Sequence, residues 1–539
     1  MTRIDERVST HVYKVKRISK EEMESIAGVC VYDQSPFCNA ACPLKLDVKA
    51  MLKAAAENDF KKAFKIYESI APFPLILSAG CGAPCEEKCR LCELGDGIAI
   101  GDIERAVALS GGAGEKRSIF RVRKKKKAAV FGSGLFALLL AGELEKKGYP
   151  VTAICGEADE EEYLRVAAGF LREDDFYTEL KRLRGKDIAF EFNAEMTREL
   201  FEEKRGGFDV LCASEKAALD IFPGAVRDEG IMLMESEGLL TGGGETVLEA
   251  ALGARKAALT ADRLAQGIDP RSARGEEGPV TSRLYTNPDL ARGLIRIKGC
   301  ESGYTREQAA EEAGRCMQCH CDECLRGCAY LRRFNKHPGL LSREIYNNTQ
   351  IIMGDHPLNR AMNACALCGQ CTVTCPHGFD MAHVCRTARE NMVDTDKMPL
   401  AAHEFALLDM LFSNGEAYLC RKQPGHSHCR YVFFPGCQAA AIAPEAVIAS
   451  YEDLCTRLKG GVALMLGCCG AIAHWAGRGE MYGEVRDKIA AELAALEDPV
   501  IIAGCPSCMK LLSEQDMAET VGIWTVLRDR GLPDGARLR

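Results

Sequence analysis

Five cysteines near the end of the chain form a pattern that could hold metal and act on sulfur. Cys437 is followed by the adjacent pair inside Gly467-Cys-Cys-Gly470 and then by Cys505-Pro-Ser-Cys508. Adjacent thiolates fit one ordinary cubane poorly, whereas five thiolates can hold an irregular iron–sulfur assembly with open or shared iron sites. We therefore predict a redox site that meets a substrate. Its metal ligands and catalytic residues are Cys437, Cys468, Cys469, Cys505 and Cys508.

Three apolar segments precede these cysteines and indicate how they are positioned. Residues 431–436 (YVFFPG), 462–467 (VALMLG) and 500–504 (VIIAG) each predict a strand that ends in glycine. Parallel α/β sheets place their sites beyond the carboxyl ends of the strands. We therefore expect the three strands to bring the five cysteines to one edge of a sheet.

The pattern resembles the CCG domain of heterodisulfide reductase catalytic subunits. The resemblance implies a non-cubane 4Fe-4S cluster that works on disulfides. The related subunit carries two such motifs, and this chain carries one. Because cleaving a disulfide takes two electrons, three alternatives stay open: one-electron steps, pairing with a second copy in a homodimer, or a different reaction.

A ferredoxin pattern precedes this region. Cys365-x2-Cys368-x2-Cys371-x3-Cys375-Pro376 is a complete run, and five more cysteines lie upstream. In two-cluster ferredoxins the fourth cysteine of each run binds the other cluster. The surrounding helical sequence resembles the C subunit of heterodisulfide reductase and the fumarate reductase iron–sulfur domain. Zinc is the alternative metal, because C-x2-C pairs also bind zinc. The rule predicts one cluster on Cys365, Cys368, Cys371 and Cys328, and another on Cys375 with three of Cys316, Cys319, Cys321 and Cys324, without choosing which.

A second cysteine-rich region lies near the N-terminus. It reads Cys30-x2-Asp33-x4-Cys38-x3-Cys42-Pro43, then Cys81-x3-Cys85-x3-Cys89, then IAIGDIERAV. It resembles the N-terminal iron–sulfur domain of the glutamate synthase small subunit, dihydropyrimidine dehydrogenase and electron-bifurcating transhydrogenases. The resemblance implies two interleaved 4Fe-4S clusters, in which oxygen ligands would be poorer donors than thiolates. One cluster would take Cys30, Cys38 and Cys89, and its fourth ligand would be Asp33, Cys92 or absent. The other cluster would take Cys42, Cys81, Cys85 and Glu104. The alternative for Glu104 is an ordinary carboxylate on a helix surface that binds no iron.

The region between the two cysteine-rich parts predicts a nucleotide-binding fold. A strand (AAVFG), the turn Gly132-Ser-Gly134-Leu-Phe-Ala137, a helix and a strand (VTAIC) follow one another. Glycines in such a turn let the backbone approach a pyrophosphate at a helix N-terminus. Residues 241–251 (TGGGETVLEAA) resemble the second flavin-contacting motif of the same flavoproteins. The resemblance implies FAD held by Gly132, Gly134, Ala137, Glu157, Gly242 and Gly243.

Two departures from that family bear on this region. Cys155 stands where an acidic residue normally ends the second strand, with Glu157 two positions on, and Gly244 replaces an aspartate. Only about 110 residues separate the two motifs, too few for the pyridine-nucleotide domain of the relatives. We therefore expect no direct NAD(P)H oxidation, and the alternative to FAD binding is a remnant that only connects the clusters.

Composition limits the class of protein. A chain of 539 residues is too long for a single hydrophobic core and predicts several domains, because single cores stop growing near ~250–300 residues. The net charge of −8 argues against a nucleic-acid partner, no apolar run approaches the ~20 residues of a membrane span, and the N-terminus lacks a signal-peptide core. The 28 cysteines, spaced C-x2-C and C-x3-C, favour iron–sulfur ligation over disulfides in a reducing, anaerobic cytoplasm.

These patterns predict a multidomain fold of α and α/β type. The domains are a helical two-cluster iron–sulfur domain (1–115), a truncated Rossmann-like FAD domain (116–298), a helical ferredoxin domain (299–400) and an α/β CCG domain (401–539). The remaining cysteines are expected to be packing residues: Cys92, Cys155, Cys212, Cys300, Cys385, Cys420, Cys429 and Cys455. For Cys420 and Cys429 the alternative is a position lining the five-cysteine site.

The predicted function is that of an iron–sulfur oxidoreductase like heterodisulfide reductase. Electrons would pass through the 4Fe-4S clusters, and FAD, to or from the five-cysteine cluster, which meets a small thiol or disulfide. The partners would be a redox protein or the subunits of a larger complex. The alternative function is an electron-transfer subunit of such a complex with no substrate site of its own.

Overall fold

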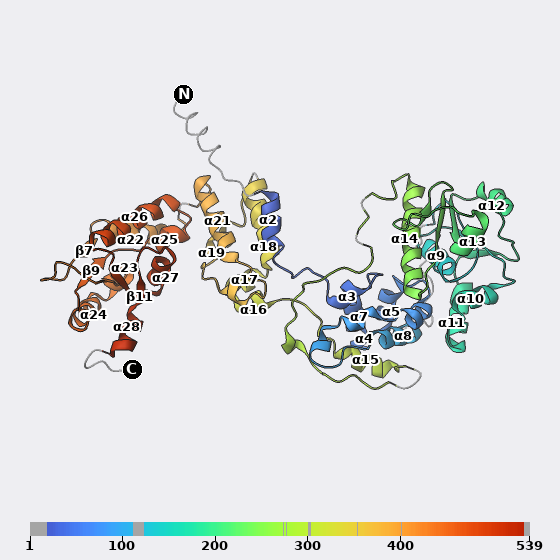
Figure 1. Ribbon diagram of the computed structural model, residues 1–539, viewed down its shortest axis with the longest axis horizontal. Helices are drawn as coiled ribbons and strands as arrows, with labels where there is room; N and C mark the ends of the chain where they lie inside the picture. The colour runs from blue at the N-terminus through green and yellow to red at the C-terminus, as the bar shows by residue number, and fades with distance from the viewer. Residues whose placement is uncertain are drawn as a thin grey trace, which may run out of the picture. The chain divides into compact units, whose positions relative to one another are not determined.

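The computed structural model describes residues 19–110, 123–272, 274–275, 277–299, 303–352, 354–399 and 401–532. It forms two compact units (Figure 1). The N-terminal unit is Val31–Cys321, and the C-terminal unit is Met1–Cys30 with Asp322–Arg539. Both units combine helices with a mainly parallel sheet, so the predicted mixture of helical and Rossmann-like α/β structure is confirmed. The four predicted domain boundaries stay a prediction.

The N-terminal unit begins with a helical part that holds the first cysteine-rich region. Helix α15, near the end of the unit, packs on α4 and α8 of this part. The fully buried Glu312 of α15 fixes it there by accepting hydrogen bonds from the backbone N–H groups of Ala99 (3.1 Å) and Ile297 (2.9 Å). The elements are α3 (Phe37–Ala41), α4 (Val48–Ala56), α5 (Phe60–Glu68), α6 (Pro74–Gly80), α7 (Pro84–Glu87), η1 (Arg90–Glu93), α8 (Ile100–Ser110), η2 (Pro288–Leu290) and α15 (Arg306–Gly314).

The rest of the N-terminal unit is a doubly wound sheet with strand order β3-β2-β1-β4-β6-β5, in which only β5 runs antiparallel. Alternate residues of β1 enter different cores, since Ala128 and Val130 face one layer and Ala129 and Phe131 the other. The long α14 packs along α9 (Figure 1). The elements are β1 (Ala128–Phe131), α9 (Leu135–Lys146), β2 (Val151–Ile154), α10 (Glu160–Ala168), α11 (Glu173–Arg184), β3 (Ile188–Glu191), α12 (Arg198–Arg205), β4 (Val210–Ser214), α13 (Glu215–Ile221), β5 (Leu233–Met234), β6 (Leu239–Gly242) and α14 (Val247–Gln266).

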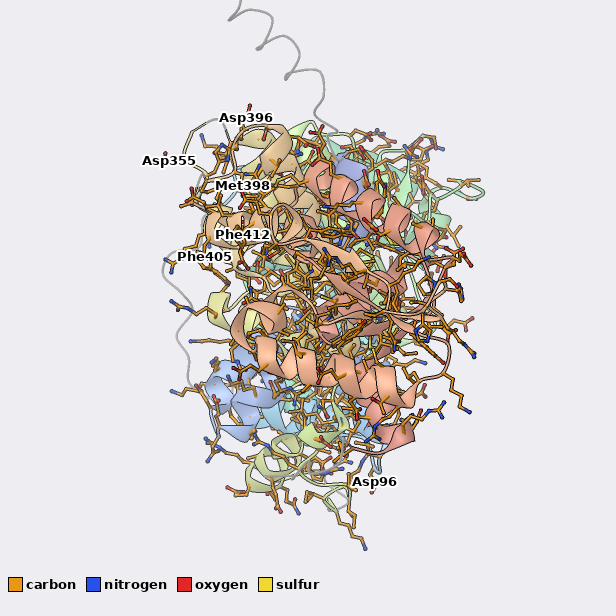
Figure 2. The ribbon with its side chains drawn as sticks, turned by 90° about the vertical axis from the view of Figure 1, so that its left-hand side faces the viewer. Asp96, Asp355, Asp396, Met398, Phe405 and Phe412 are labelled. Atoms are coloured by element: carbon orange, nitrogen blue, oxygen red, sulfur yellow. The ribbon has the colours of Figure 1, made fainter. Side chains whose placement is uncertain are left out.

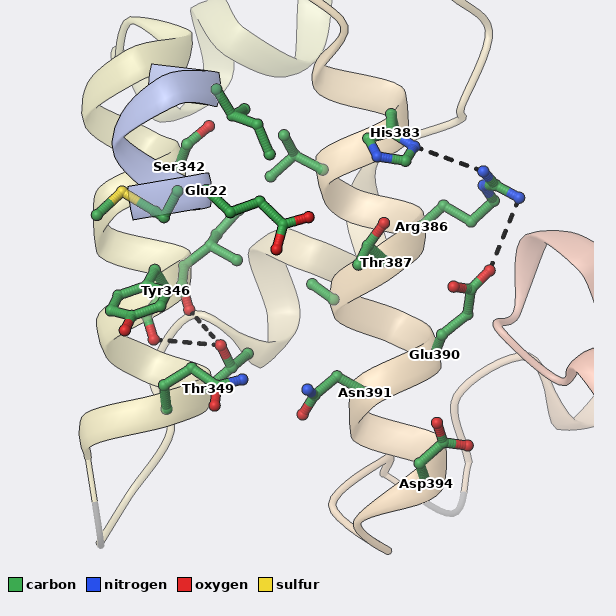
Figure 3. Close-up of a pocket in the computed structure, with 16 residues that line it drawn as sticks. Glu22, Ser342, Tyr346, Thr349, His383, Arg386, Thr387, Glu390, Asn391 and Asp394 are labelled. Atoms are coloured by element: carbon green, nitrogen blue, oxygen red, sulfur yellow. Dashed lines mark hydrogen bonds and ion pairs between the residues drawn. The ribbon is translucent and has the colours of Figure 1, made fainter. Parts of the chain in front are cut away.

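The helical part of the C-terminal unit carries the ferredoxin run. Helix α2 packs on α18, α18 and α19 pack on α21, and α16 packs on α20. A cavity lies between α2, α18 and α21, where Figure 3 shows Glu22, Ser342 and Asn391 on its three sides. The elements are α2 (Lys20–Ala27), α16 (Glu323–Gly327), α17 (Ala329–Phe334), α18 (Pro338–Tyr346), η3 (Asn347–Ile351), α19 (Asn359–Ala364), α20 (Gln370–Thr374) and α21 (Met381–Asp394).

The C-terminal unit ends in a five-stranded sheet of order β11-β10-β8-β9-β7, with β7 antiparallel. Helices α26 and α27 cover one face, and α24 and α28 the other. Helix α22 leaves Phe405 and Phe412 exposed, and Figure 2 labels both. The elements are α22 (Glu404–Asn414), β7 (Leu419–Arg421), β8 (Tyr431–Phe434), α23 (Cys437–Ile442), α24 (Pro444–Arg457), β9 (Val462–Leu466), α25 (Ala471–Trp475), α26 (Gly479–Ala495), β10 (Val500–Ala503), α27 (Pro506–Glu514), β11 (Thr520–Gly522) and α28 (Ile523–Arg530). Among the described residues, no helix combines the length and apolarity that a membrane span requires.

Candidate functional site

The five C-terminal cysteines gather at the carboxyl edge of the second sheet. Strands β10, β8 and β9 are neighbours in it, and each leads directly into its cysteines. Gly436, between β8 and Cys437, has a φ of +87°, and a Cβ there would lie 3.1 Å from the Cβ of Cys505 and 3.3 Å from the Sγ of Cys508. Glycine thus provides both the backbone conformation and the close approach. The strands position the cysteine groups side by side.

The thiols of this site contact one another in a chain. Cys437 shares a hydrogen bond with Cys468, Cys468 with Cys469, and Cys469 with Cys508. The pKa of Cys468 is raised to about 11: the bond with Cys437 lowers it, but the bond with Cys469 and burial outweigh that effect. Buried thiols at such spacing ionise together only when metal neutralises their charge. The donor set therefore fits a metal-bound assembly.

The spacing of the donors also bears on the kind of metal. Within the described ranges, no three His, Cys, Asp or Glu side chains are grouped tightly enough for a single ion. An iron–sulfur cluster holds its thiolates at separate iron atoms and so needs a wider arrangement than one zinc ion. Zinc stays the alternative metal that C-x2-C spacing left open.

Asn414, at the end of α22, fixes the backbone of the cysteine pair. Its Oδ1 accepts a hydrogen bond from the N–H of Cys468 (2.8 Å), and its Nδ2 donates to the carbonyl of the same residue (3.1 Å). The carbonyl of Asn414 itself accepts a hydrogen bond from Lys488 (2.8 Å). This two-sided clamp defines where Cys468 points. The sequence gave no indication of this role, because Asn414 is a single asparagine outside any motif.

The cysteines of the ferredoxin region cluster between α16, α20 and their neighbours. Helices α16 and α20 approach closely at Gly327, where a Cβ would lie 2.6 Å from the Cγ2 of Thr374. Cys371 is buried, and burial foremost, with the nearby Cys328, raises its pKa. Cys368 is exposed, and Cys321 is the last residue of the other unit and stays a prediction from spacing. One apolar cluster includes or contacts Cys324, Cys328, Cys365, Cys371 and Cys375.

Cys365 has two neighbours that the sequence did not indicate as partners. The buried thiol of Cys385 donates a hydrogen bond to Cys365 and, against the effect of burial, lowers the pKa of Cys365 below its ordinary value. Arg389, which is 2% exposed, donates hydrogen bonds to the carbonyls of Cys365, Met362 (2.9 Å) and Trp475 (2.6 Å). Arg389 therefore connects the backbone at Cys365 to α25, the helix that follows the cysteine pair. No carboxylate of the described chain pairs with this cation.

In the N-terminal unit, Cys38 and Cys89 gather with two cysteines from far along the chain. Cys316 and Cys319 reach them because α15 ends there, and all four line one small cavity. Burial foremost, and then Cys316, Cys319 and Cys89, raise the pKa of Cys38. Lys49 donates a hydrogen bond to the carbonyl of Cys319 (2.9 Å). Four thiols around a cavity fit a 4Fe-4S cluster.

This set differs in composition from the one that the family resemblance implied. Cys30 belongs to the C-terminal unit, and Asp33 is exposed and does not line the cavity. Cys92, the suggested substitute, is exposed, and its thiol donates to the carbonyl of Glu86 (3.4 Å). The sequence left open which upstream cysteine is excluded from the ferredoxin cluster; the structure brings both Cys316 and Cys319 to Cys38.

The second set of ligand candidates in the N-terminal unit consists of the four residues that the family resemblance implied, Cys42, Cys81, Cys85 and Glu104. Cys42, Cys81 and Cys85 act on one another electrostatically, and Glu104 acts on all three. Glu104 is 4% exposed, so it is no ordinary surface carboxylate. Burial raises the pKa of Glu104 to about 8, although the hydroxyl of Tyr67 counteracts it. Three thiols and one carboxyl group fit a cluster with one oxygen ligand.

The glycine turn after β1 has room for a phosphate group at one position. A Cβ at Gly132 would lie 2.5 Å from the Oγ of Ser214, whereas a Cβ at Gly134 would meet no atom of the chain within 4 Å. The Oε2 of Glu157 is buried without a hydrogen-bond partner among the described residues. These features fit the adenosine and pyrophosphate part of a dinucleotide. Ala137 is buried in α9 behind the turn.

The second glycine motif is packed more closely. A Cβ at Gly242 would lie 2.6 Å from both Phe136 and Met232, and one at Gly243 would lie 2.3 Å from Glu215. Glu249 closes the start of α14 through a capping box with Thr246. An open cavity lies over Gly243 and Gly244.

The cysteines expected to be packing residues show varied burial. Cys155, Cys212, Cys385 and Cys429 are fully buried, whereas Cys420 and Cys455 are half-buried. Cys300 lies outside the described residues. The cysteines of the described chain form no disulfide bond.

Comparison with protein families identifies two iron–sulfur regions. Residues 7–112 match the model for dihydropyrimidine dehydrogenase domain II, 4Fe-4S cluster, and residues 315–380 match that of a 4Fe-4S dicluster domain. Both matches agree with the regions in which cysteine spacing predicted clusters. The chain therefore carries 4Fe-4S domains at both places.

The chain is also similar to parts of several curated oxidoreductases. It is 28% identical over 230 residues to the NADPH-Fe(3+) oxidoreductase subunit beta of Geobacter sulfurreducens, covering 40% of this chain and 33% of the relative. It is 28% identical over 159 residues to the NADP(+)-dependent formate dehydrogenase subunit beta of Moorella thermoacetica (25% and 21%). It is 29% identical over 146 residues to the glutamate synthase [NADPH] small chain of Azospirillum brasilense (25% and 29%). The chain thus spans a third or less of the length of these relatives, which are all oxidoreductases or their subunits.

Proposed function

We propose that this chain is an iron–sulfur oxidoreductase that exchanges electrons with a small thiol or disulfide at the five-cysteine site. The observation that carries the proposal is the contact chain of Cys437, Cys468, Cys469 and Cys508 at the edge of three neighbouring strands. Iron–sulfur clusters supply one-electron transfer when bound. The non-cubane cluster would be held by these four cysteines and Cys505.

The protein's own groups would prepare this site in two ways. Asn414 holds the backbone of Cys468 on both sides, which keeps the cysteine pair in one orientation. Cys437 and Cys505 are partly exposed, whereas Cys468, Cys469 and Cys508 are buried. A sulfur substrate would therefore approach from the side of Cys437 and Cys505. Cleavage of a disulfide to two thiols consumes two electrons and two protons, and a redox partner protein would supply the electrons.

The remaining clusters would connect this site to the partner. The 4Fe-4S clusters of the ferredoxin region would take their thiolates from α16, α20 and the loops beside them, and those of the N-terminal unit from the two sets around Cys38 and Cys42. Several relatives are named as subunits, which supports membership in a larger complex. FAD, held by Gly132, Gly134, Ala137 and Glu157 with Gly242 and Gly243, would exchange electrons in pairs or singly.

A second candidate function is an electron-transfer subunit without a substrate of its own. The tight packing of Phe136 and Met232 at Gly242 and the presence of one cysteine-pair motif favour it. It predicts that the isolated chain is inactive with every small disulfide and gains activity only with a partner reductase.

The experiment is thiol–disulfide turnover by anaerobically iron-loaded protein, with reduced viologen as donor and glutathione disulfide as acceptor. We expect turnover in the wild type and its loss in Cys469→Ala. Cys455→Ala, which changes a half-buried cysteine on α24, is the matched control and keeps activity. Undiminished turnover by Cys469→Ala with full iron in the other sites would refute the proposal.

A further inference from the structure

The ferredoxin region, counted by its own spacing rule, lacks one thiolate. The complete run places its cysteines at 365, 368, 371 and 375. The same spacing read back from Cys328 requires cysteines at 324, 321 and 318, and position 318 is Gln318. Two 4Fe-4S clusters require about eight thiolates. By this spacing, the cluster that includes Cys324 and Cys375 lacks one thiolate.

The neighbouring residues do not supply the missing ligand. Cys316 and Cys319 line the cavity with Cys38 and Cys89 in the N-terminal unit. The side-chain amide of Gln318 donates hydrogen bonds to the carbonyl of Lys49 (3.2 Å) and to the Sγ of Cys316 (3.4 Å). Gln318 is thus committed to the other cysteine set.

Cys30 lies in the same unit as Cys324 and Cys375. Cys30 follows α2, which packs on α18 beside the cavity of Figure 3. Its N–H donates a hydrogen bond to the carbonyl of Ala27 (3.1 Å), which closes the turn after α2. Cys30 packs against the apolar cluster that contains Cys324, and Cys375 packs against the same cluster. No other cysteine from before residue 322 belongs to this unit in its described part.

A glycine on α18 makes this position available. A Cβ at Gly339 would lie 2.8 Å from the Cβ of Cys30 and 2.9 Å from the carbonyl oxygen of Ala27. Both distances are too short for any side chain at position 339. The glycine therefore admits the turn that carries Cys30 against α18.

We infer that Cys30 is a ligand of the ferredoxin-region cluster that also uses Cys324 and Cys375. Its counterpart is the N-terminal cluster held by Cys38, Cys89, Cys316 and Cys319. Each cysteine-rich region thus supplies ligands to a cluster of the other region. Cys30, from the first region, binds a cluster of the second, and Cys316 and Cys319, from the second region, bind a cluster of the first. The N-terminal cluster has four thiolates in this assignment, and Asp33 is not needed.

The exchange has a consequence for assembly. Neither cysteine-rich region contains a full ligand set within its own stretch of sequence. Metal binding and folding are coupled in such sites. A fragment that ends before residue 316 would lack two thiolates of its first cluster, and a fragment that begins after residue 30 would lack one thiolate of the ferredoxin region.

The test compares paired alanine variants of the full chain, loaded anaerobically, by iron content and by spin quantitation of the reduced clusters. If Cys30 and Cys324 bind one cluster, Cys30→Ala/Cys324→Ala loses no more iron than Cys324→Ala, about four atoms per chain at most. Cys30→Ala/Cys38→Ala then loses the sum of the two single losses. The opposite pattern, additive with Cys324→Ala and non-additive with Cys38→Ala, would overturn the inference. Cys455→Ala is the control and keeps full iron.

A second measurement avoids changing Cys30. In Cys38→Ala, Cys30 stays protected from anaerobic alkylation, whereas Cys89 becomes reactive; reactivity of Cys30 in that variant would overturn the inference. Gly339→Ala raises alkylation of Cys30, while the control Gly479→Ala, whose Cβ meets no atom within 4 Å, does not. Equal alkylation in these two variants would contradict the role of Gly339. Because these readouts do not involve turnover, they are independent of the proposed thiol–disulfide activity.

Discussion

Replacing Arg389 by methionine tests the connection between the ferredoxin region and the cysteine-pair site. Arg389 is 2% exposed and donates to three backbone carbonyls, one at Cys365 and one at Trp475. Methionine fills much of the same volume but donates no hydrogen bond. The change leaves buried carbonyl groups without this donor and removes the cation beside Cys365.

The expected loss follows from these contacts. A hydrogen bond that involves a charged group contributes about 1.5–3 kcal/mol, so three bonds give a gross loss of roughly 4.5–9 kcal/mol. Removing a buried cation recovers several kcal/mol of desolvation cost. The net local destabilisation is therefore about 3 kcal/mol, which corresponds to about a hundredfold faster opening of the affected segment.

Hydrogen exchange of the amides in α25 measures this opening. The N–H groups of His474 and Ala476 donate within α25 and its C-terminal turn, next to the carbonyl that Arg389 holds. Arg386→Met is the matched control, because Arg386 lies on the same helix in a half-exposed pair with Glu390 (3.7 Å) that contributes about 0.3–0.5 kcal/mol. Equal exchange in the two variants, or unchanged exchange in Arg389→Met, would show that Arg389 does not stabilise α25.

Three further predictions concern the individual sites. Asn414→Ala removes the clamp on Cys468, and we expect a broadened cluster EPR signal and at least tenfold slower disulfide turnover with full iron; an unaltered spectrum would contradict the positioning role. Glu104→Gln keeps an oxygen donor and its iron, whereas Glu104→Ala loses iron at that N-terminal cluster; equal iron in both would show that Glu104 is not a ligand. Glu157→Gln weakens FAD binding about tenfold or more, because a charged hydrogen bond to ribose contributes about 1.5–3 kcal/mol; flavin fluorescence titration with unchanged affinity would argue against that contact.

The strands that deliver the five cysteines could be predicted closely from the sequence. The apolar runs expected over 431–436, 462–467 and 500–504 contain β8 (Tyr431–Phe434), β9 (Val462–Leu466) and β10 (Val500–Ala503). Both faces of these strands are covered by helices, so the buried run itself is the signal. The first Rossmann strand was equally predictable, since AAVFG precedes the glycine turn and forms β1 (Ala128–Phe131).

The spacing of cysteines in the sequence could not predict which cysteines from distant parts of the chain lie together. Cys316 and Cys319 join Cys38 and Cys89 because α15 packs on α4 and α8, with Glu312 bonded to the N–H of Ala99 just before α8. This packing leaves no local pattern in the sequence. Two successive C-x2-C pairs, Cys316 with Cys319 and Cys321 with Cys324, also gave the ferredoxin rule more cysteines than it could place. Single polar residues such as Asn414 and Arg389 have roles that arise only from the backbone groups they meet in the folded chain.

In the proposed function, the five-cysteine site reacts with sulfur substrates. The most direct measurement is freeze-quench EPR of anaerobic, fully iron-loaded protein before and after addition of glutathione disulfide. We expect a new paramagnetic signal in the wild type that is absent in Cys469→Ala and present in Cys455→Ala. Complete iron loading with no disulfide-dependent signal would exclude this function and leave the chain as an electron-transfer subunit.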